Sequence, residues 1–474
     1  MTKKDLLSIL AVFLTFLFFI SSASAQKEII GEKIDQYLTT RSEMGNFSGA
    51  VLIAKDGKVL IRKGFGFADV EKKIPYTPET QQEVASISKM FTSMAALKLR
   101  DQGKLKLDDG ICKFLENCPE SWRQITIQQL MRHTSGIPDY EEPLGLGTAK
   151  YLEFMAKPDA SALIVENAKK LPLDFKPGSK FNYSNTAYIV LSYVVQKAAN
   201  QPFFDFVTRN ILRPAGMKHS GVINSNHLPK DLAKGYSAKD IGWEKALAGV
   251  PLTDGHLKRV PTISLTSPEG DAWLYSTVDD LYRWSQLMDG NEKFASKDEV
   301  AEIFTPGLEG YGYGWFVGKG FDRRRMRHNG GLPGYISDLI KFPDDKITIV
   351  VFSNFDRARL SNISRDISAI VLGTPYDMPV RGKVIKLTSE QIGSLIGDYK
   401  MADGTLLTIR NEPNFLTANL QGRYTAGLIP LSSTEFYFPL ADGKAIFTLD
   451  STGKAKSANM RYSGEDHLAE RVNE

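Results

Sequence analysis

The residues in this sequence best suited to chemistry are Ser86 and Lys89, in the run Ser86-Ile87-Ser88-Lys89. Apolar periodicity predicts a helix from Ser86 to about Arg100, and residues three apart share one face of a helix. A serine hydroxyl needs a base, and a lysine shielded from water can lose its proton near neutral pH. Backbone N–H groups at a helix start also stabilise negative charge. The spacing predicts a nucleophile, although alone it also fits a helix cap followed by a solvated lysine.

A second group of polar residues, Tyr183-Ser184-Asn185, follows the loop at residues 176–179. The phenol of Tyr183 could relay a proton, and the amide of Asn185 could hold a substrate amide. The alternative is a buried aromatic residue followed by a turn residue.

A third group contains His328, Gly330 and Gly331, and it follows a stretch that we expect to be a strand. A pair of glycines lets a substrate backbone approach a strand edge closely. The alternative for His328 is a surface histidine in a turn.

Strands are predicted at both ends of the region that carries these groups, with helical segments between them. Ser48 to Ala68 reads as a hairpin, and further strands are expected at Tyr311–Val317, Ile336–Phe342 and Ile347–Phe352. We therefore expect an α/β (α+β) fold, in which one antiparallel sheet from both chain ends is flanked by helices and carries a helical subdomain.

The last part of the chain has a different pattern. Residues 385–474 are short alternating stretches with glycine-rich turns, which is typical of a small all-β barrel or sandwich. We place a first domain at residues 26–380 and this small domain at residues 385–474.

The first 25 residues predict a signal peptide. Lys3 and Lys4 precede an apolar run from Leu6 to Ile20, and Ala23-Ser24-Ala25 supplies small residues for cleavage. The run is shorter than the roughly 20 residues that span a bilayer, so we expect cleavage rather than an anchor. The mature protein is expected to be exported, periplasmic or secreted, with no stable membrane span.

Composition limits the partners. Apolar residues make up 42% and charged residues 24% of the chain, the net charge is +4, and the basic residues are interleaved with acidic ones, so nucleic-acid binding is not expected. No metal-ligand motif or nucleotide-binding glycine loop occurs, so neither a metal nor a cofactor is expected.

Cys112 and Cys118 are the only cysteines and predict a local disulfide in an exported protein. No coiled coil or repeat predicts an oligomeric state.

Taken in order, these groups resemble the motifs of the serine β-lactamase and penicillin-binding protein superfamily, in the branch of class C β-lactamases, D-alanyl-D-alanine peptidases and related esterases. The resemblance extends from about Ser48 to Phe355 and includes the stretch from Leu130 to Pro138, which contains His133. The segment from residue 385 resembles the lipocalin-like barrel appended to several members.

The resemblance implies a role for each site residue. Ser86 attacks a carbonyl and becomes acylated, and Lys89 and Tyr183 share the general-base and general-acid duties in an order left open. Asn185 orients the substrate, and the backbone N–H groups of Ser86 and Gly331 form the oxyanion hole.

One departure concerns His328, which stands with Asn329 and Gly330 where class C β-lactamases have Lys-Thr-Gly. A histidine is mostly neutral at pH 7, so attraction to a substrate carboxylate is weakened and efficient β-lactam hydrolysis is not expected. If protonation of His328 matters, kcat/KM for anionic substrates should improve as the pH falls toward 6.

The sequence therefore predicts a serine hydrolase that acts on a small ester or a D-amino-acid amide or peptide through an acyl-enzyme. The alternative function is a non-catalytic receptor of the same fold that binds a peptide or glycan.

Overall fold

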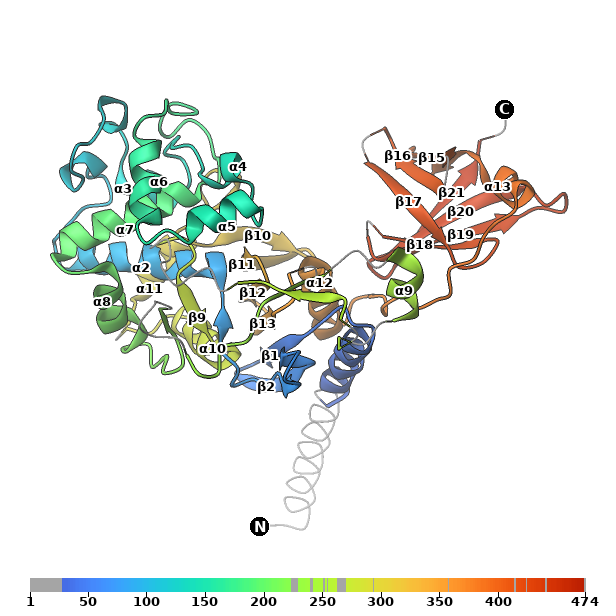
Figure 1. Ribbon diagram of the computed structural model, residues 1–474, viewed down its shortest axis with the longest axis horizontal. Helices are drawn as coiled ribbons and strands as arrows, with labels where there is room; N and C mark the ends of the chain where they lie inside the picture. Colours follow the sequence, from blue (N-terminus) through green and yellow to red (C-terminus); the bar gives the residue numbers. More distant parts are fainter. Residues whose placement is uncertain are drawn as a thin grey trace, which may run out of the picture. The chain divides into compact units, whose positions relative to one another are not determined.

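The structure is a computed structural model (Figure 1). It describes residues 28–222, 229–238, 242–249, 252–253, 255–261, 270–292, 294–356, 358–412, 415–422, 424–439 and 441–472. The expected signal peptide lies outside the described residues. The chain divides into a sheet unit (residues 47–239 and 255–360) and a barrel unit (residues 1–46, 240–254 and 361–474).

The sheet unit is built on six antiparallel strands in the order β10-β11-β12-β13-β1-β2. The first strand pairs with the last, with Gly49 opposite Ser353, so the two chain ends do share one sheet as predicted. The strands are β1 (Gly49–Lys55), β2 (Lys58–Phe65), β10 (Phe316–Gly320), β11 (Arg323–Leu332), β12 (Tyr335–Phe342) and β13 (Ile347–Ser353).

Tight turns set the register of this sheet. Asp56 and Gly57 join β1 to β2 with φ values of 52° and 71°, the left-handed conformation that suits a two-residue hairpin. The other short strands of the sheet unit are β3 (Phe67–Asp69), β4 (Ile74–Pro75), β5 (Gln82–Glu83), β6 (Gly221–Val222), β7 (Tyr236–Ala238), β8 (Leu257–Arg259) and β9 (Leu274–Ser276).

Helices make up most of the regular structure between β2 and β10, in agreement with the expected helical subdomain (Figure 1). The two longest, α2 (Ser88–Asp101) and α7 (Asn185–Ala199), are largely buried in the main core. The other helices are α3 (Ile127–Met131), α4 (Glu141–Leu144), α5 (Ala149–Met155), α6 (Ala160–Ala168), α8 (Phe203–Val207), α10 (Val278–Leu287) and α11 (Lys297–Ile303). The short helical turns are η1 (Ala85–Ile87), η2 (Ile111–Lys113), η3 (Glu120–Trp122), η4 (Thr208–Leu212) and η6 (Leu308–Gly310).

Two local predictions were wrong. The strand expected from Tyr311 begins only at Phe316, because the chain turns at Gly314, whose φ is +77°. A Cβ at Gly314 would lie 2.7 Å from the Cα of Met90, so the turn also lets this segment pack closely against α2. The group at residues 328–331 lies within strand β11 and does not follow a strand.

The barrel unit contains a closed eight-stranded antiparallel barrel, which confirms the all-β prediction for the last part of the chain. A helix at residues 28–43, α9 (Gly242–Ala248), α12 (Leu360–Leu372) and α13 (Ser389–Leu395) complete the unit. The barrel strands are β14 (Gly397–Met401), β15 (Leu406–Glu412), β16 (Phe415–Leu420), β17 (Tyr424–Pro430), β18 (Glu435–Phe438), β19 (Gly443–Leu449), β20 (Ala455–Tyr462) and β21 (Glu465–Arg471).

In the described part of the chain, no helix is long and apolar enough to span a bilayer.

A buried polar network links three segments of the barrel unit. Arg41, on the helix at residues 28–43, forms an ion pair with Asp442 in the turn between β18 and β19. Its guanidinium also donates to the hydroxyl of Tyr37 at 2.8 Å, and this hydroxyl donates to Asp366 of α12 at 2.6 Å. All four side chains are buried. A buried charge is costly without a partner, and Arg41 finds its partner in Asp442 of the barrel. This ion pair therefore holds the helix at residues 28–43 against the barrel.

Replacing Arg41 with Ala should lower the free energy of unfolding by about 3–5 kcal/mol, because the carboxylate of Asp442 would stay buried without its cation. Urea unfolding followed by circular dichroism measures this loss. The exposed Lys33 of the same helix supplies the control, and Lys33→Ala should leave the transition unchanged. Equal stability of the two variants would contradict a structural role for the network.

Candidate active site

Ser86 lies in the helical turn η1 that leads directly into α2. Ala85, immediately before it, has a φ of +50°, an unusual conformation for a residue with a side chain. This turn orients Ser86 so that its Oγ lies 2.9 Å from the Nζ of Lys89. The structure thus brings together the serine and lysine that the sequence spacing paired.

Lys89 is completely buried, and its amine has two further partners. Its Nζ lies 2.7 Å from Oδ1 of Asn185 and 3.2 Å from the backbone carbonyl oxygen of Asp271. Burial lowers the pKa of Lys89 and so favours the neutral amine. A neutral amine has two N–H donors for these two oxygens and one lone pair for the hydroxyl proton of Ser86. The geometry therefore fits a general base.

Tyr183 lies beside this pair, with the centre of its ring 4.9 Å from the Nζ of Lys89. Loss of hydration raises the pKa of Tyr183, while a side-chain hydrogen bond with Ser86 acts in the opposite direction. Tyr183 precedes α7, which is capped by the Ser184 hydroxyl and has Asn185 as its first residue. The cap therefore fixes two site residues at one helix start.

His133 supports Tyr183, and we did not predict a role for it in the site. The backbone N–H of Ser184 donates to Nδ1 of His133 at 3.0 Å, and the rings of His133 and Tyr183 have centres 4.2 Å apart. Burial lowers the pKa of His133, so the ring is neutral and can accept this hydrogen bond. The sequence feature that could have indicated this role is the position of His133 in the stretch from Leu130 to Pro138, which resembles a segment of the family.

His328 is buried, unlike the surface histidine considered as an alternative. Its Nε2 lies 2.9 Å from the hydroxyl of Tyr311, and its Nδ1 lies 2.7 Å from the carbonyl oxygen of Asn329. Burial, followed by the charge of Lys89, lowers the pKa of His328 to about 3. A pKa lowered this far keeps His328 neutral near pH 6, so we no longer expect a gain for anionic substrates at that pH.

Gly330 allows strand β11 to approach the turn that carries the nucleophile. A Cβ at this position would lie 2.1 Å from the carbonyl oxygen of Val84, which also accepts a 2.8 Å hydrogen bond from the hydroxyl of Ser337. At Gly331 the nearest atom to such a Cβ would be 3.9 Å away, in Ile336. Gly330 is thus required for packing, whereas Gly331 borders open space.

Acidic side chains that we did not predict surround Lys89. Asp271 is buried and accepts a 3.1 Å hydrogen bond from the hydroxyl of Tyr140, and burial raises the pKa of its carboxyl to about 7. Burial likewise raises the pKa of Glu141 to about 7. The charges of Asp271, Glu141 and Asp139 each act to raise the pKa of Lys89, against the larger effect of burial.

A pocket of about 500 Å³ adjoins the site at Gly331. Apolar side chains form much of its wall, Lys258 and Arg259 of β8 add two cations, and Asp356 adds one carboxylate. No group of three or more His, Cys, Asp or Glu side chains able to hold a metal ion is found among the described residues. Elsewhere in the sheet unit, Cys112 and Cys118 form a disulfide.

Changing Gly330 to Ala should lower the free energy of unfolding by about 2 kcal/mol or more, because the added methyl group would displace β11 from Val84. Thermal unfolding measures the change, and Gly331→Ala is the matched control because its methyl group has room. If both variants unfold at the temperature of the parent protein, the close approach of β11 is not required for stability.

Comparison with known proteins supports the same fold. A sequence profile of the family described as beta-lactamase matches residues 34–369. Penicillin-binding protein 4* of Bacillus subtilis (strain 168) is 29% identical over 448 residues, which cover 91% of this chain and 97% of that protein.

Solved structures extend this comparison. The octameric penicillin-binding protein homologue from Pyrococcus abyssi is 24% identical, with a TM-score of 0.64 over 93% of this chain and 99% of that one. A D-stereospecific amidohydrolase from Streptomyces sp. is 23% identical, with a TM-score of 0.57 over 71% of this chain and 98% of that one. At these identities the two structures show a shared fold. The profile match, which covers more than half of the sequence, places this chain in the beta-lactamase family.

Proposed function

We propose that this protein is a serine hydrolase that forms an acyl-enzyme at Ser86 and acts on an ester or a D-amino-acid amide. The main support is the contact of Lys89 with Ser86, in which a buried amine with a lowered pKa lies 2.9 Å from the hydroxyl oxygen. A serine used only as a helix cap has no need of a desolvated lysine, whose burial costs stability.

In the acylation step, Ser86 Oγ attacks the substrate carbonyl carbon as its proton moves to the neutral amine of Lys89. The carbonyl oxygen gains negative charge and faces the backbone N–H groups of Ser86 and Gly331. The bond to the leaving group then breaks. The phenol of Tyr183 donates its proton to the leaving group, and Lys89 passes the proton it took from Ser86 to Tyr183. Water then repeats the sequence on the acyl-enzyme, releasing the acid and restoring Ser86.

The pKa shifts favour a division of labour between Lys89 and Tyr183. Burial favours the deprotonated form of Lys89, whereas loss of hydration favours the protonated phenol of Tyr183. We therefore assign the first proton abstraction to Lys89 and proton donation to the leaving group to Tyr183, the order that the sequence left open.

The pocket beside Gly331 supports a small-molecule or peptide substrate with an apolar acyl group. Leu332, Pro333 and Ile336 line it. No permanent cation occupies the position of His328, so any attraction for a substrate carboxylate would come from the side chains of Lys258 and Arg259. The D-stereospecific amidohydrolase from Streptomyces sp. shares the fold and makes a D-amino-acid amide the first substrate class to test.

We also propose that the protein is exported. The predicted signal peptide at residues 1–25 and the disulfide between Cys112 and Cys118 support this location, because disulfides persist in oxidising compartments. Intact-mass measurement of the protein made in a bacterial host tests it, since cleavage after Ala25 gives a chain that begins at Gln26. An uncleaved chain would contradict the proposal.

Purified residues 26–474 should hydrolyse p-nitrophenyl acetate and gain the mass of one acetyl group at Ser86. Changing Ser86 to Ala should abolish both, because it removes the attacking oxygen. Changing Tyr183 to Phe should slow turnover about 100-fold or more, the usual contribution of a positioned acid or base. Ser179→Ala, at an exposed loop serine, is the control and should behave as the parent protein.

The Ser86 variants also separate catalysis from binding. Hydrolysis by the Ser86→Ala protein would exclude Ser86 as the nucleophile. A parent protein that is neither labelled nor active on esters and D-amino-acid amides, but binds peptides or glycans, would instead support the non-catalytic receptor.

The pH profile tests the carboxyl groups around Lys89. Activity should fall as the pH drops through the pKa of Lys89, because the protonated amine cannot accept a proton. The charges of Asp271 and Glu141 raise that pKa. Both carboxyls have pKa values of about 7, so they carry this charge mainly above that pH. Where the acid limb of kcat/KM lies in that range, Asp271→Asn and Glu141→Gln should lower the pKa of Lys89 and move the limb to lower pH.

The neighbouring Glu142 is exposed and provides the matched control for this experiment. Glu142→Gln should leave the acid limb in place. An acid limb that moves to higher pH in Asp271→Asn would exclude the assigned electrostatic effect.

A further inference from the structure

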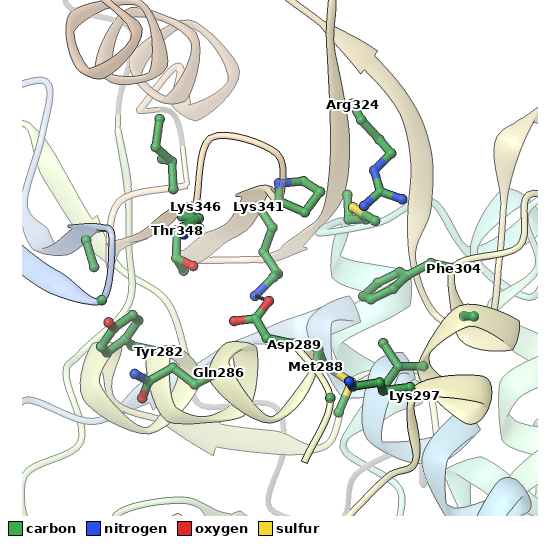
Figure 2. Close-up of a pocket in the computed structure, with 18 residues that line it drawn as sticks. Tyr282, Gln286, Met288, Asp289, Lys297, Phe304, Arg324, Lys341, Lys346 and Thr348 are labelled. Atoms are coloured by element: carbon green, nitrogen blue, oxygen red, sulfur yellow. Dashed lines mark ion pairs between the residues drawn. The ribbon is translucent and has the colours of Figure 1, made fainter. Parts of the chain in front are cut away.

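A second cavity lies at the opposite end of strand β11 from the active site (Figure 2). It has a volume of about 650 Å³ and lies between the sheet and helices α10 and α11. Arg324 of β11 lines it, six residues before Gly330, a separation of about 20 Å along an extended strand. None of the residues assigned to catalysis borders this cavity.

The wall of the cavity carries an excess of positive charge. Four cationic side chains line it and Asp289 is the one acidic residue among the lining residues. The cationic residues are Lys297, Arg324, Lys341 and Lys346. Lys341 neutralises Asp289 through a 2.8 Å ion pair, so three cations on the wall are not balanced by it.

The buried amine of Lys341 fixes one side of the cavity. Its Nζ donates to the carbonyl oxygen of Ser285 at 2.6 Å, in the last turn of α10, and pairs with Asp289 just beyond that helix. Figure 2 shows this side chain reaching from the sheet toward the helix. These two contacts hold the end of α10 to β12. Because Asp289 is paired with Lys341, its carboxylate does not neutralise Lys297, Arg324 or Lys346.

The remaining cations approach from different elements. Figure 2 shows Arg324 on the sheet side and Lys297 on the helical side, with the ring of Phe304 between them, and Lys346 at the turn before β13. Arg324 has an exposed partner, Asp344, at 3.5 Å. No ion pair is formed by Lys297 or Lys346 with any residue that the structure describes.

Apolar side chains supply a second kind of contact. Met288, Phe304 and Met326 line the cavity together with the cations. The volume lies within the range of roughly 300–1,000 Å³ that is usual for small-molecule sites, so it exceeds what an inorganic ion needs. The wall therefore suits a ligand with both an anionic group and an apolar body.

We propose that this cavity binds an organic phosphate monoester, with its phosphate attracted by the wall cations Lys297, Arg324 and Lys346 and its apolar part against Phe304 and Met326. A phosphate monoester carries a charge of about −1.5 to −2 at pH 7, which matches several cations better than a single carboxylate does. The inference is independent of the proposed hydrolase activity, because the two sites share no residue.

Isothermal titration calorimetry of residues 26–474 with phenyl phosphate tests the proposal. The parent protein should bind it saturably, and more tightly than inorganic phosphate or phenol, because each of these lacks one part of the ligand. Changing both Lys297 and Lys346 to Gln should weaken binding about tenfold. The matched double variant Lys319→Gln/Lys400→Gln removes two exposed strand lysines outside the cavity and should bind as the parent does.

Unchanged circular dichroism and p-nitrophenyl acetate hydrolysis in the Lys297/Lys346 variant would show that its fold is intact. Equal affinities of the two double variants would place the ligand outside this cavity and overturn the proposal. Absence of saturation in the parent at millimolar phenyl phosphate would overturn it as well, and neither outcome would affect the assignment of Ser86.

Discussion

The burial of Lys89 is the constraint on which the rest of the site depends. An amine taken out of water is stable only if it is neutral or well paired, and here its three contacts come from separate parts of the chain. They are supplied by the turn at Ser86, the first residue of α7 and the backbone before β9. The core around α2 and α7 must therefore be complete before the lysine has its partners, so folding and the activation of the serine are coupled.

The same burial keeps the aromatic and imidazole groups of the site neutral. His133 and His328 both have lowered pKa values, and Tyr183 has a raised one, so none of the three adds a charge near neutral pH. The ionisable charge lies instead on carboxyl groups behind Lys89, such as Asp271. The protonation of the lysine is thus set by a balance between desolvation and nearby negative charge.

Local patterns were sufficient to predict part of this arrangement. The pairing of Ser86 with Lys89 depends on helical spacing, and the sheet and barrel follow from alternating apolar residues. The role of Asp271 could not be predicted from the sequence. Asp271 is 182 residues away from Lys89 in the sequence, and only the folded chain brings its backbone carbonyl oxygen to the lysine amine. The Tyr-Gly alternation from Tyr311 imitates a strand, and only the packing of Gly314 against α2 shows why it is not one.

Closure of the barrel limits how the C-terminal segment can meet other molecules. β14 hydrogen-bonds to both β15 and β21, so each strand of the barrel has a neighbour on both sides, although β17 pairs with β18 only at Ile429 and Pro430. Closure therefore disfavours the addition of an extra strand by a peptide or by a second copy of the chain. Any molecule recognised there must be selected by side chains and connecting turns, which can change in sequence while the hydrogen-bonded framework stays the same.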